Sequence, residues 1–394
     1  MKSLLHIGLI LFSVLAFSQP NTEVYLFDLT IADGKPVLSN PKNISNNDGY
    51  DNQPSFLDNN TVLFSSTRAD QTDIRRLDIE NGSITSWITD TPTGSEYSPL
   101  KIPGKQAVSA IRLDLNGLQR LYEYNIKTGR SKLILKDSKV GYHLWYTADI
   151  LVSTVLVENR MDLVVSNLKD GTNYTFQKNV GRSLHKIPNT ELISYISKEK
   201  EVWEIKSLNP ISGATKKIAN TLNNTEDMCW LNDGTILIGS GKSILKMNPA
   251  TDIRWQLVQS FKQEEINNIS RITVNQNSKR LAFVAEESPA VIVQKQLDAY
   301  NARDIDAFMD TYSQNIKLYN HPEKLFSEGQ EKMRASYKSY FETTPDLHCE
   351  IKNRIVIGNK VIDEEYITAN GANFSAVAIY EVENGKISKV TFIQ

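Results

Sequence analysis

Residues 56–64 have the sequence FLDNNTVLF, in which a polar Asp-Asn turn separates two short apolar runs. The same order of an apolar run, a turn and an apolar run occurs six times, with the turns at positions 58, 103, 147, 188, 232 and 275. These positions are 41 to 45 residues apart, which indicates an internal repeat. Each repeat continues with further strand-like runs, such as residues 74–79 and 84–88. Four short strands per repeat, separated by turn residues, predict the blades of a β-propeller.

The two ends of this array are incomplete repeats. Residues 22–46 supply only the outer half of a blade, and residues 266–287 supply only the inner half. Pairing the two halves would complete one blade and remove two exposed strand edges, which otherwise promote aggregation. We therefore expect a closed, all-β, six-bladed propeller over residues 21–287.

The pattern changes to a mixture of helices and strands after Pro289. Val293, Leu297 and Tyr300 recur at helical spacing, and Asp304 is a candidate cap for a second, short helix. Residues 327–330, Ser-Glu-Gly-Gln, predict a capping box that starts a third helix. Hairpin turns at 358–359, 370–371 and 384–385 then separate four expected strands. This order predicts an α+β domain over residues 289–394.

The N-terminus and the overall charge limit where the protein acts. Lys2, an apolar run over residues 4–12 and Ala16-Phe17-Ser18 predict a cleaved signal peptide over residues 1–18. An uncleaved anchor is the alternative, but the run is shorter than the ~20 residues that span a bilayer. We therefore expect an exported protein, periplasmic or extracellular, with no membrane span after cleavage. The formal charge of −2 lacks the positive surface that nucleic-acid binding requires.

Residues that commonly carry chemistry are sparse. Cys229 and Cys349 form no disulfide framework, so two buried free thiols are expected. The five histidines show no metal-ligand spacing, and no metal or cofactor is expected. Residues 239–243, Gly-Ser-Gly-Lys-Ser, lack the spacing of a phosphate loop and are interpreted as a hairpin turn.

The candidate ligand-binding residues all lie in the C-terminal domain. They are Tyr312, Asn320, His321, Tyr337 and Tyr366. His321 is also the candidate catalytic acid or base, because imidazole titrates near neutral pH; the alternative is that residues 320–322 are a polar turn. Residues 363–365, Asp-Glu-Glu, place carboxylates on alternate faces of a strand, so at least one points inward or lies at the rim and could act as a base. We favour the interpretation that these carboxylates form a solvated cluster at a sheet edge.

One repeat resembles a known family of propellers. Tyr50-Asp51, Pro54, Asp58-Asn59, Asn81-Gly82 and the run over 62–68 resemble a repeat of the TolB-like six-bladed propellers. The resemblance implies binding of other proteins. Related propellers gate a hydrolase domain, but the Gly-x-Ser-x-Gly elbow of such a hydrolase is absent from the sequence.

Residues 297–308 resemble the SnoaL-like branch of the nuclear transport factor 2-like superfamily, which includes ketosteroid isomerases. The resemblance implies a conical sheet around a pocket and frequent dimerisation through the outer face of the sheet. By alignment, the general base of the isomerases falls on Asn320, their oxyanion tyrosine on Gln296, and their protonated aspartate near Ala378 or Ile379. An amide cannot accept a substrate proton near neutral pH, and an alanine or isoleucine cannot donate a hydrogen bond to an enolate, so ketosteroid isomerisation is not expected.

Three functions remain open. The first is a noncatalytic exported binding protein, whose propeller recognises a protein or glycan and whose C-terminal domain supplies a small-ligand pocket or a dimer contact. The second is an enzyme of isomerase, cyclase or hydrolase type, acting on a small apolar molecule in the C-terminal pocket. The third is a sensor, in which occupancy of the pocket alters the partner of the propeller. The lack of a recognisable catalytic set favours the first.

Overall fold

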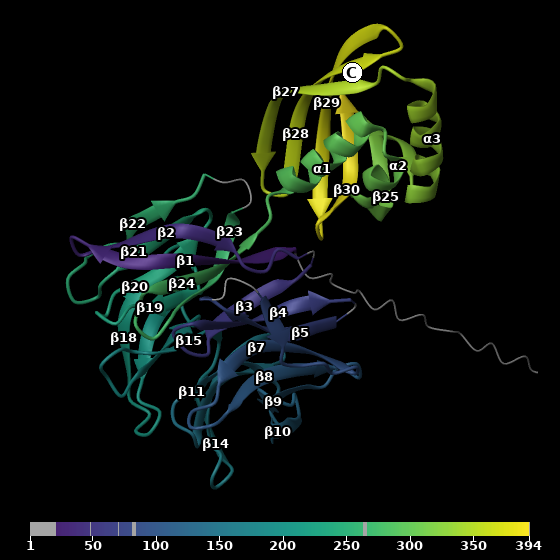
Figure 1. Cartoon of the computed structure of the whole chain (residues 1–394). Coiled ribbons are helices and arrows are strands. Elements are labelled where there is room, and N and C mark those ends of the chain that lie inside the picture. The colour runs from purple at the N-terminus through teal and green to yellow at the C-terminus, as the bar shows by residue number, and fades with distance from the viewer. Residues whose placement is uncertain (1–20, 48, 70, 81–83, 263–265, 394) are drawn as a thin grey trace, which may run out of the picture.

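The computed structural model describes residues 21–47, 49–69, 71–80, 84–262 and 266–393. The predicted signal peptide, residues 1–18, and the Asn81-Gly82 turn lie outside the described residues. Figure 1 shows a larger β-rich body that contains the N-terminal strands and a smaller body that carries the helices. Over the described ranges, no helix has the length and apolar character needed to cross a bilayer.

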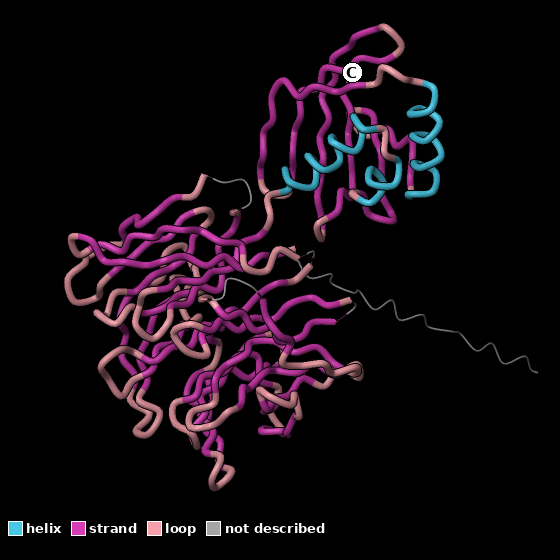
Figure 2. The backbone as a smooth tube through the Cα atoms, in the orientation of Figure 1, coloured by secondary structure: helices cyan, strands magenta, loops and turns pink. Residues whose placement is uncertain are grey.

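Within the described residues, the larger body contains six antiparallel sheets of four strands each (Figure 2). Five of them use strands that are consecutive in the chain. These are β3 (Asp51–Phe56), β4 (Thr61–Arg68), β5 (Gln71–Asp78) and β6 (Ile84–Trp87); β7 (Gly94–Lys101), β8 (Ala107–Asp114), β9 (Gln119–Asn125) and β10 (Ser131–Leu135); β11 (Val140–Trp145), β12 (Ile150–Val157), β13 (Arg160–Asn167) and β14 (Thr172–Gln177); β15 (Val180–Lys186), β16 (Ile193–Ser197), β17 (Glu204–Leu208) and β18 (Thr215–Asn220); and β19 (Met228–Trp230), β20 (Ile236–Ser240), β21 (Ser243–Met247) and β22 (Gln256–Ser260).

The sixth sheet joins the two ends of the array. Its spatial order is β2 (Lys35–Asn43), β1 (Thr22–Ala32), β24 (Arg280–Glu286) and β23 (Asn267–Val274). Antiparallel pairing of β1 with β24 runs from Thr22 opposite Glu286 to Asp28 opposite Arg280. Phe27 and Phe283 stack across this pair with their ring centroids 5.1 Å apart. The expectation that the incomplete ends share one sheet is confirmed.

The second strand of a sheet is covered on both faces by neighbouring sheets. Val62, Leu63 and Phe64 are consecutive in β4, and all three have no exposed surface. Side chains of successive strand residues point to opposite faces, so both faces of β4 must be covered. Trp145 and Trp230 each donate from the indole N–H to a serine hydroxyl 36 residues earlier, at 2.9 Å. The repeat in the sequence is therefore also a repeat of contacts between sheets.

The first strands of the six sheets contact one another in sequence, from β3 through β7, β11, β15 and β19 to β23, and β23 contacts β3 again. Hydrogen bonds between turns follow the same order. The side-chain amide of Asn189 donates to the carbonyl of Asn232, 3.2 Å away, and that of Asn232 donates to Gln276 at 2.8 Å. The amide of Asn275 then donates to Asn59 at 3.1 Å, which links the last turn of the array to the first.

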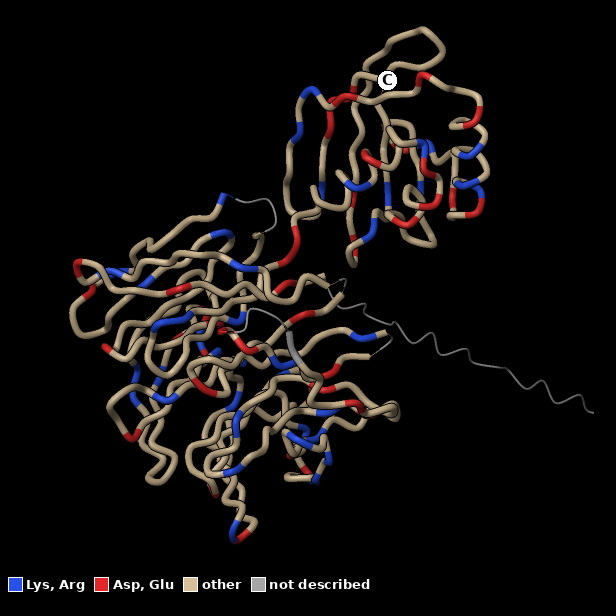
Figure 3. Tube along the Cα trace, viewed as in Figure 1, with Lys and Arg blue, Asp and Glu red and all other residues tan. Residues whose placement is uncertain are grey.

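The smaller body is an α+β unit. Its elements are α1 (Pro289–Ala302), α2 (Ile305–Asp310), β25 (Tyr312–Asn320), β26 (Lys324–Glu328), α3 (Gln330–Thr343), β27 (His348–Ile357), β28 (Lys360–Ala369), β29 (Ala372–Glu383) and β30 (Lys386–Ile393). The six strands form one sheet in the order β26-β25-β30-β29-β28-β27, in which only the β25–β30 pair is parallel over the described residues. Basic and acidic residues are interspersed along the chain in both bodies (Figure 3).

Of the local features predicted for this body, the cap of α2 and the three hairpin turns are present, and the capping box is not. The carboxylate of Asp304 accepts hydrogen bonds from the N–H groups of Asp306 and Ala307, at 3.1 and 3.0 Å, which confirms the cap of α2. The predicted capping box is wrong, because Ser327 pairs with Leu318 inside the sheet and its backbone is extended. Helix α3 begins only at Gln330, without a side-chain cap. The three predicted hairpin turns are present, and the two Asn-Gly turns have positive φ at both residues, as type I′ turns require.

Candidate functional site

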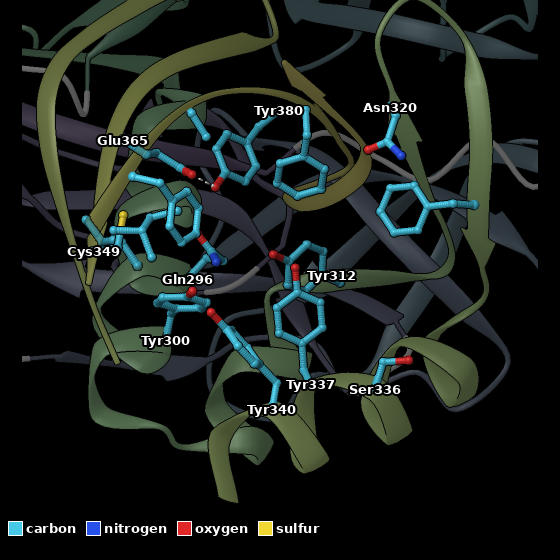
Figure 4. A pocket seen from close by; sticks show the side chains of 16 residues that line it. Gln296, Tyr300, Tyr312, Asn320, Ser336, Tyr337, Tyr340, Cys349, Glu365 and Tyr380 are labelled. Atoms are coloured by element: carbon cyan, nitrogen blue, oxygen red, sulfur yellow. Dashed lines mark hydrogen bonds between the residues drawn. The ribbon is translucent and has the colours of Figure 1, made fainter. Parts of the chain in front are cut away.

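A cavity of about 330 Å³ lies between the sheet and helices α1 and α3 of the C-terminal body (Figure 4). Its lining combines apolar residues with a set of polar side chains. The polar side chains are Gln296, Tyr300, Tyr312, Asn320, Ser336, Tyr337, Tyr340, Cys349, Glu365 and Tyr380. Phe326 and Phe374 also line the cavity and are 44% and 40% exposed, so the mouth of the cavity is aromatic.

The periodicity of each element directs these side chains inward. Gln296 and Tyr300 are four residues apart in α1, and Tyr337 and Tyr340 are three apart in α3, so each pair shares one face of its helix. In β28, every second side chain faces the helices, and Glu365 lies on that face. The inward faces of these three elements of the cavity wall can thus be predicted from spacing, although which elements meet depends on the fold.

Glu365 is the only carboxylate among the lining residues of this cavity, and it is 6% exposed. Its Oε1 accepts a hydrogen bond from the Tyr380 hydroxyl at 2.8 Å, the dashed line of Figure 4. Over the described residues, its Oε2 has no hydrogen-bond partner in the protein. Burial raises the pKa of Glu365 to about 7, against the opposing effect of the Tyr380 hydrogen bond. At neutral pH, this carboxyl group is therefore divided between its protonated and ionised forms.

The tyrosines remain neutral hydroxyls. Burial raises the pKa of Tyr312, Tyr337 and Tyr380 far above neutrality, so each can both donate and accept a hydrogen bond. Phe308 packs against Tyr337 and Tyr312 with ring centroids 4.7 and 5.1 Å apart. Phe308 has no exposed surface, so these contacts hold the two tyrosines from the core side.

The structure places three of the five predicted ligand-binding residues in the cavity. Tyr312, Asn320 and Tyr337 line it; Asn320 is exposed. His321 is outside the lining, and its backbone N–H donates to the Phe392 carbonyl at 2.8 Å in an exposed turn, as the polar-turn alternative predicted. The placement of Tyr366 in the pocket is corrected, because Tyr366 is not among the residues that line the cavity.

Tyr366 lies one residue from Glu365, on the opposite face of β28, where the Lys352 ammonium is 5.0 Å from its ring centroid. Successive side chains of a strand point to opposite faces, so Glu365 faces the cavity and Tyr366 faces away from it. The same alternation corrects the interpretation of residues 363–365 as a solvated cluster. Asp363 and Glu365 are 1% and 6% exposed, and only Glu364 faces solvent.

The buried Asp363 is already neutralised. It accepts two hydrogen bonds from the guanidinium of Arg354, from Nε and Nη2, both at 2.7 Å. A bidentate pair of this kind occupies both carboxylate oxygens with charge-assisted hydrogen bonds. Asp363 is not among the residues that line the cavity. Glu365 is therefore the carboxyl group available to a ligand.

The positions aligned with the isomerase machinery provide no matching chemistry. Gln296 and Asn320 both line the cavity but carry amides, and Ala378 is buried with no exposed surface. Burial raises the pKa of Cys349 to about 12, so this thiol is a poor nucleophile. Both cysteines are free and buried, as expected. In the described part of the chain, no group of three or more His, Cys, Asp or Glu side chains could hold a metal ion.

Sequence reasoning missed the pairing of Glu365 with Tyr380, and also the contributions of Tyr300 and Tyr340. Glu365 and Tyr380 are on adjacent strands, where Tyr380 lies opposite Val361 rather than opposite Glu365. The contact is diagonal and depends on two long side chains. Tyr300 and Tyr340 shared helical faces with predicted core residues, a signal that does not separate a core position from a cavity wall.

Comparison with protein families assigns this part of the chain. The family model described as SnoaL-like domain matches residues 293–390. Residues 293–390 form a SnoaL-like domain. Comparison with the curated proteins finds no match.

Solved structures similar to the SnoaL-like domain include three bacterial proteins. A cystatin-fold protein from Novosphingobium aromaticivorans is 29% identical over 27% of this chain and 98% of its own, with a TM-score of 0.26. An NTF2-like protein from Cytophaga hutchinsonii is 19% identical over 27% of this chain and 88% of its own, with a TM-score of 0.24. An NTF2-like protein from Burkholderia xenovorans is 23% identical over 26% of this chain and 80% of its own, with a TM-score of 0.24.

The match to the SnoaL-like family model concerns the fold of residues 293–390. A fold that hosts several functions does not choose among them, so the choice rests on the residues of the cavity.

Proposed function

We propose that the protein is an exported binding protein in which a six-bladed β-propeller carries a SnoaL-like ligand-binding domain. The circular contacts among first strands and the Asn275 to Asn59 hydrogen bond support the propeller. The propeller would occupy residues 21–287 and the second domain residues 289–394. In this proposal, the loop face of the propeller binds a protein or glycan, and a dimer through the outer face of the SnoaL-like sheet is compatible with it.

The observation that carries the binding function is the protonatable carboxyl group of Glu365 inside a cavity whose other lining side chains are uncharged. A protonated carboxyl donates one strong hydrogen bond without bringing a charge into an apolar site. The exposed aromatic rings of Phe326 and Phe374 at the mouth favour an apolar body for the ligand. We therefore propose a small, largely apolar ring compound with one carbonyl group that accepts from Glu365.

A pair of probes tests this chemistry. 2-Acetylnaphthalene and 2-ethylnaphthalene share a ring system and differ in one carbonyl group. Calorimetric titration of the full chain at pH 6 should show about ten-fold tighter binding of the ketone, the value of one net hydrogen bond. The preference should disappear by pH 9, where Glu365 is ionised and cannot donate.

Two matched variants test whether Glu365 is the source of the preference for the ketone. Glu365→Gln keeps an N–H donor and should retain the preference at pH 9. Glu364→Gln makes the same change on the solvent face of β28 and should behave like the wild type. Equal binding of the two naphthalenes at pH 6, or a preference independent of pH in the wild type, would contradict the proposed role of Glu365.

The alternative function, an enzyme in the same cavity, is favoured by one observation. A carboxyl group with a pKa of about 7 is suited to accept and return a proton near neutral pH. The ionised Glu365 would remove a proton from the carbon next to a carbonyl group. Exchange of the methyl protons of 2-acetylnaphthalene in D2O, followed by NMR, separates the two functions. An enzyme should exchange them faster than buffer and lose this activity in Glu365→Gln, whereas a binding protein should leave the rate at that of buffer.

A further inference from the structure

A second cavity, of about 190 Å³, lies where the first strands of the six sheets meet. Its lining comes from all six sheets: residues 53–55, 98–100, 142–144, 182–185, 227–228 and 271–273. None of these residues belongs to the SnoaL-like cavity. A ligand of this second cavity would therefore be held by other residues than a ligand of the SnoaL-like domain.

The ionised side chains that line this second cavity are Arg182, Arg271 and Asp227. Arg182 donates to both carboxylate oxygens of Asp227, with Nε 2.8 Å from Oδ1. Nη1 of Arg271 lies 3.6 Å from the same carboxylate. His143 and His185 also line the cavity, and burial lowers their pKa to about 3 and about 4, so both are neutral near pH 7. Arg182 also lies 3.6 Å from a carboxylate oxygen of Glu226, outside the lining, so Arg182 has two carboxylate partners and Arg271 has only the more distant contact with Asp227.

Arg271 retains donors that its protein partners do not use. A guanidinium carries five N–H groups. Nη2 donates one to the Tyr142 hydroxyl at 3.0 Å, and the distance from Nη1 to Asp227 is too long for a hydrogen bond. The side chain is only 14% exposed, so few waters can reach the remaining donors. Arg271 also has φ +51°, where the register of β23 shifts between Ser270 and Thr273.

Gln53 presents a second unused donor group to the cavity. Its Oε1 accepts from the Ser98 backbone N–H at 2.9 Å and from the Ser65 hydroxyl at 3.0 Å, which fixes the orientation of the amide. Over the described residues, its NH2 group has no hydrogen-bond partner in the protein. Gln53 and Ser98 have φ +54° and +53°. Three non-glycine residues in the left-handed region therefore lie on the adjacent first strands β23, β3 and β7, a conformation that persists only where its surroundings impose it.

We propose that this cavity binds the carboxylate of a small organic acid, held by the guanidinium of Arg271 and the side-chain NH2 of Gln53. A guanidinium matches a planar carboxylate with paired N–H donors. Among the described residues, Arg271 has no carboxylate within hydrogen-bond distance, and a monoanion placed there is repelled less by Asp227 than a phosphate dianion would be. The cavity holds the equivalent of about six waters at ~30 Å³ each, which limits the acid to a few carbon atoms. Pro54, Pro99 and Leu144 provide an apolar wall for them.

Butyrate, butyramide and inorganic phosphate are suitable probes for calorimetric titration of the full chain. Butyramide has the shape of butyrate without its charge, and phosphate has more charge with another shape. We expect one butyrate per chain, bound at least about ten-fold tighter than either other probe. No saturable butyrate binding up to about 10 mM, or equal binding of butyramide, would overturn the proposal even without a variant.

Gln53→Glu then locates the site, because glutamate keeps the acceptor for Ser98 and Ser65 but replaces the amide donors with a negative charge. This variant should weaken butyrate binding by about ten-fold or more through like-charge repulsion. Gln276→Glu adds the same charge at an exposed position outside the lining and should bind like the wild type. Butyrate binding that is unchanged in Gln53→Glu would place the acid elsewhere, including the SnoaL-like cavity, and refute this site.

Discussion

Replacing Glu365 by Gln should stabilise the SnoaL-like domain at alkaline pH and leave it almost unchanged in acid. Glutamine keeps the oxygen that accepts from Tyr380, and it resembles the protonated carboxyl group in shape and charge. Burial raises the pKa of Glu365 from 4.5 to about 7 in the folded protein. Folding therefore carries a cost for this carboxyl group that depends on pH.

The magnitude follows from the two protonation equilibria. Below pH 4.5, Glu365 is protonated in both the folded and the unfolded state, and it imposes no ionisation cost. Between 4.5 and about 7, only the unfolded state loses the proton, so the free energy of unfolding falls as pH rises. Above that range the loss is complete and amounts to about 3 kcal/mol. Glu365→Gln removes this loss, so the variant should exceed the wild type by about 3 kcal/mol at pH 8.

Hydrogen exchange measured by mass spectrometry is the appropriate assay. All five tryptophans lie between residues 87 and 255, so tryptophan fluorescence follows the six sheets and not this domain. Peptides from β28 and β29 should show protection that converges for the two proteins at pH 5 and separates at pH 8, after correction for the intrinsic exchange rate. Glu364→Gln, on the solvent face, is the control and should not reproduce the separation. A constant difference between Glu365→Gln and wild type across this range would refute the reasoning.

Two further predictions concern the architecture. Deleting residues 21–46 removes β1, which exposes the buried edge of β24 and removes several fully buried apolar side chains. The midpoint of thermal unfolding of the sheets should therefore fall by roughly 10 °C or more. A midpoint within about one degree of that of the intact protein would exclude ring closure. Arg354→Met leaves the carboxylate of Asp363 buried and unpaired, which should lower the free energy of unfolding of the SnoaL-like domain by about 3 to 5 kcal/mol in urea titrations. The double variant Arg354→Met/Asp363→Leu should recover much of that loss, and no recovery would indicate that packing of the arginine, not its charge, is the cause.

Much of the fold could be predicted because it depends on local periodicity. The turns at 58, 103, 147, 188, 232 and 275 precede the second strands of successive sheets, and the Asn-Gly pairs at 370–371 and 384–385 specify tight hairpins. Local signals failed where pairing with another strand competed for the same residues. Ser327 matched a capping pattern, but it pairs with Leu318 in the sheet, 9 residues earlier in the chain.

The candidate site was predictable in part for the same reason. Alternation alone requires that Glu365 and Tyr366 point to opposite faces of β28, and the helical spacing of Gln296 and Tyr300 requires a shared face. Which face of β28 is covered is set by packing of α1 and α3 against the sheet. The spacing therefore shows that only one of Glu365 and Tyr366 can face the cavity, but it does not show which one.

By itself, the amino-acid sequence determined the repeat, the α+β order after Pro289 and the inward or outward alternation of each strand, because all of these arise from neighbours a few residues apart. Only the tertiary structure decided that Glu365 meets Tyr380 in a cavity, and that Gln53 and Arg271, more than two hundred residues apart, line another. Hydrogen-bond geometry and desolvation depend on what surrounds a group in space. Those surroundings come from segments that no local pattern brings together.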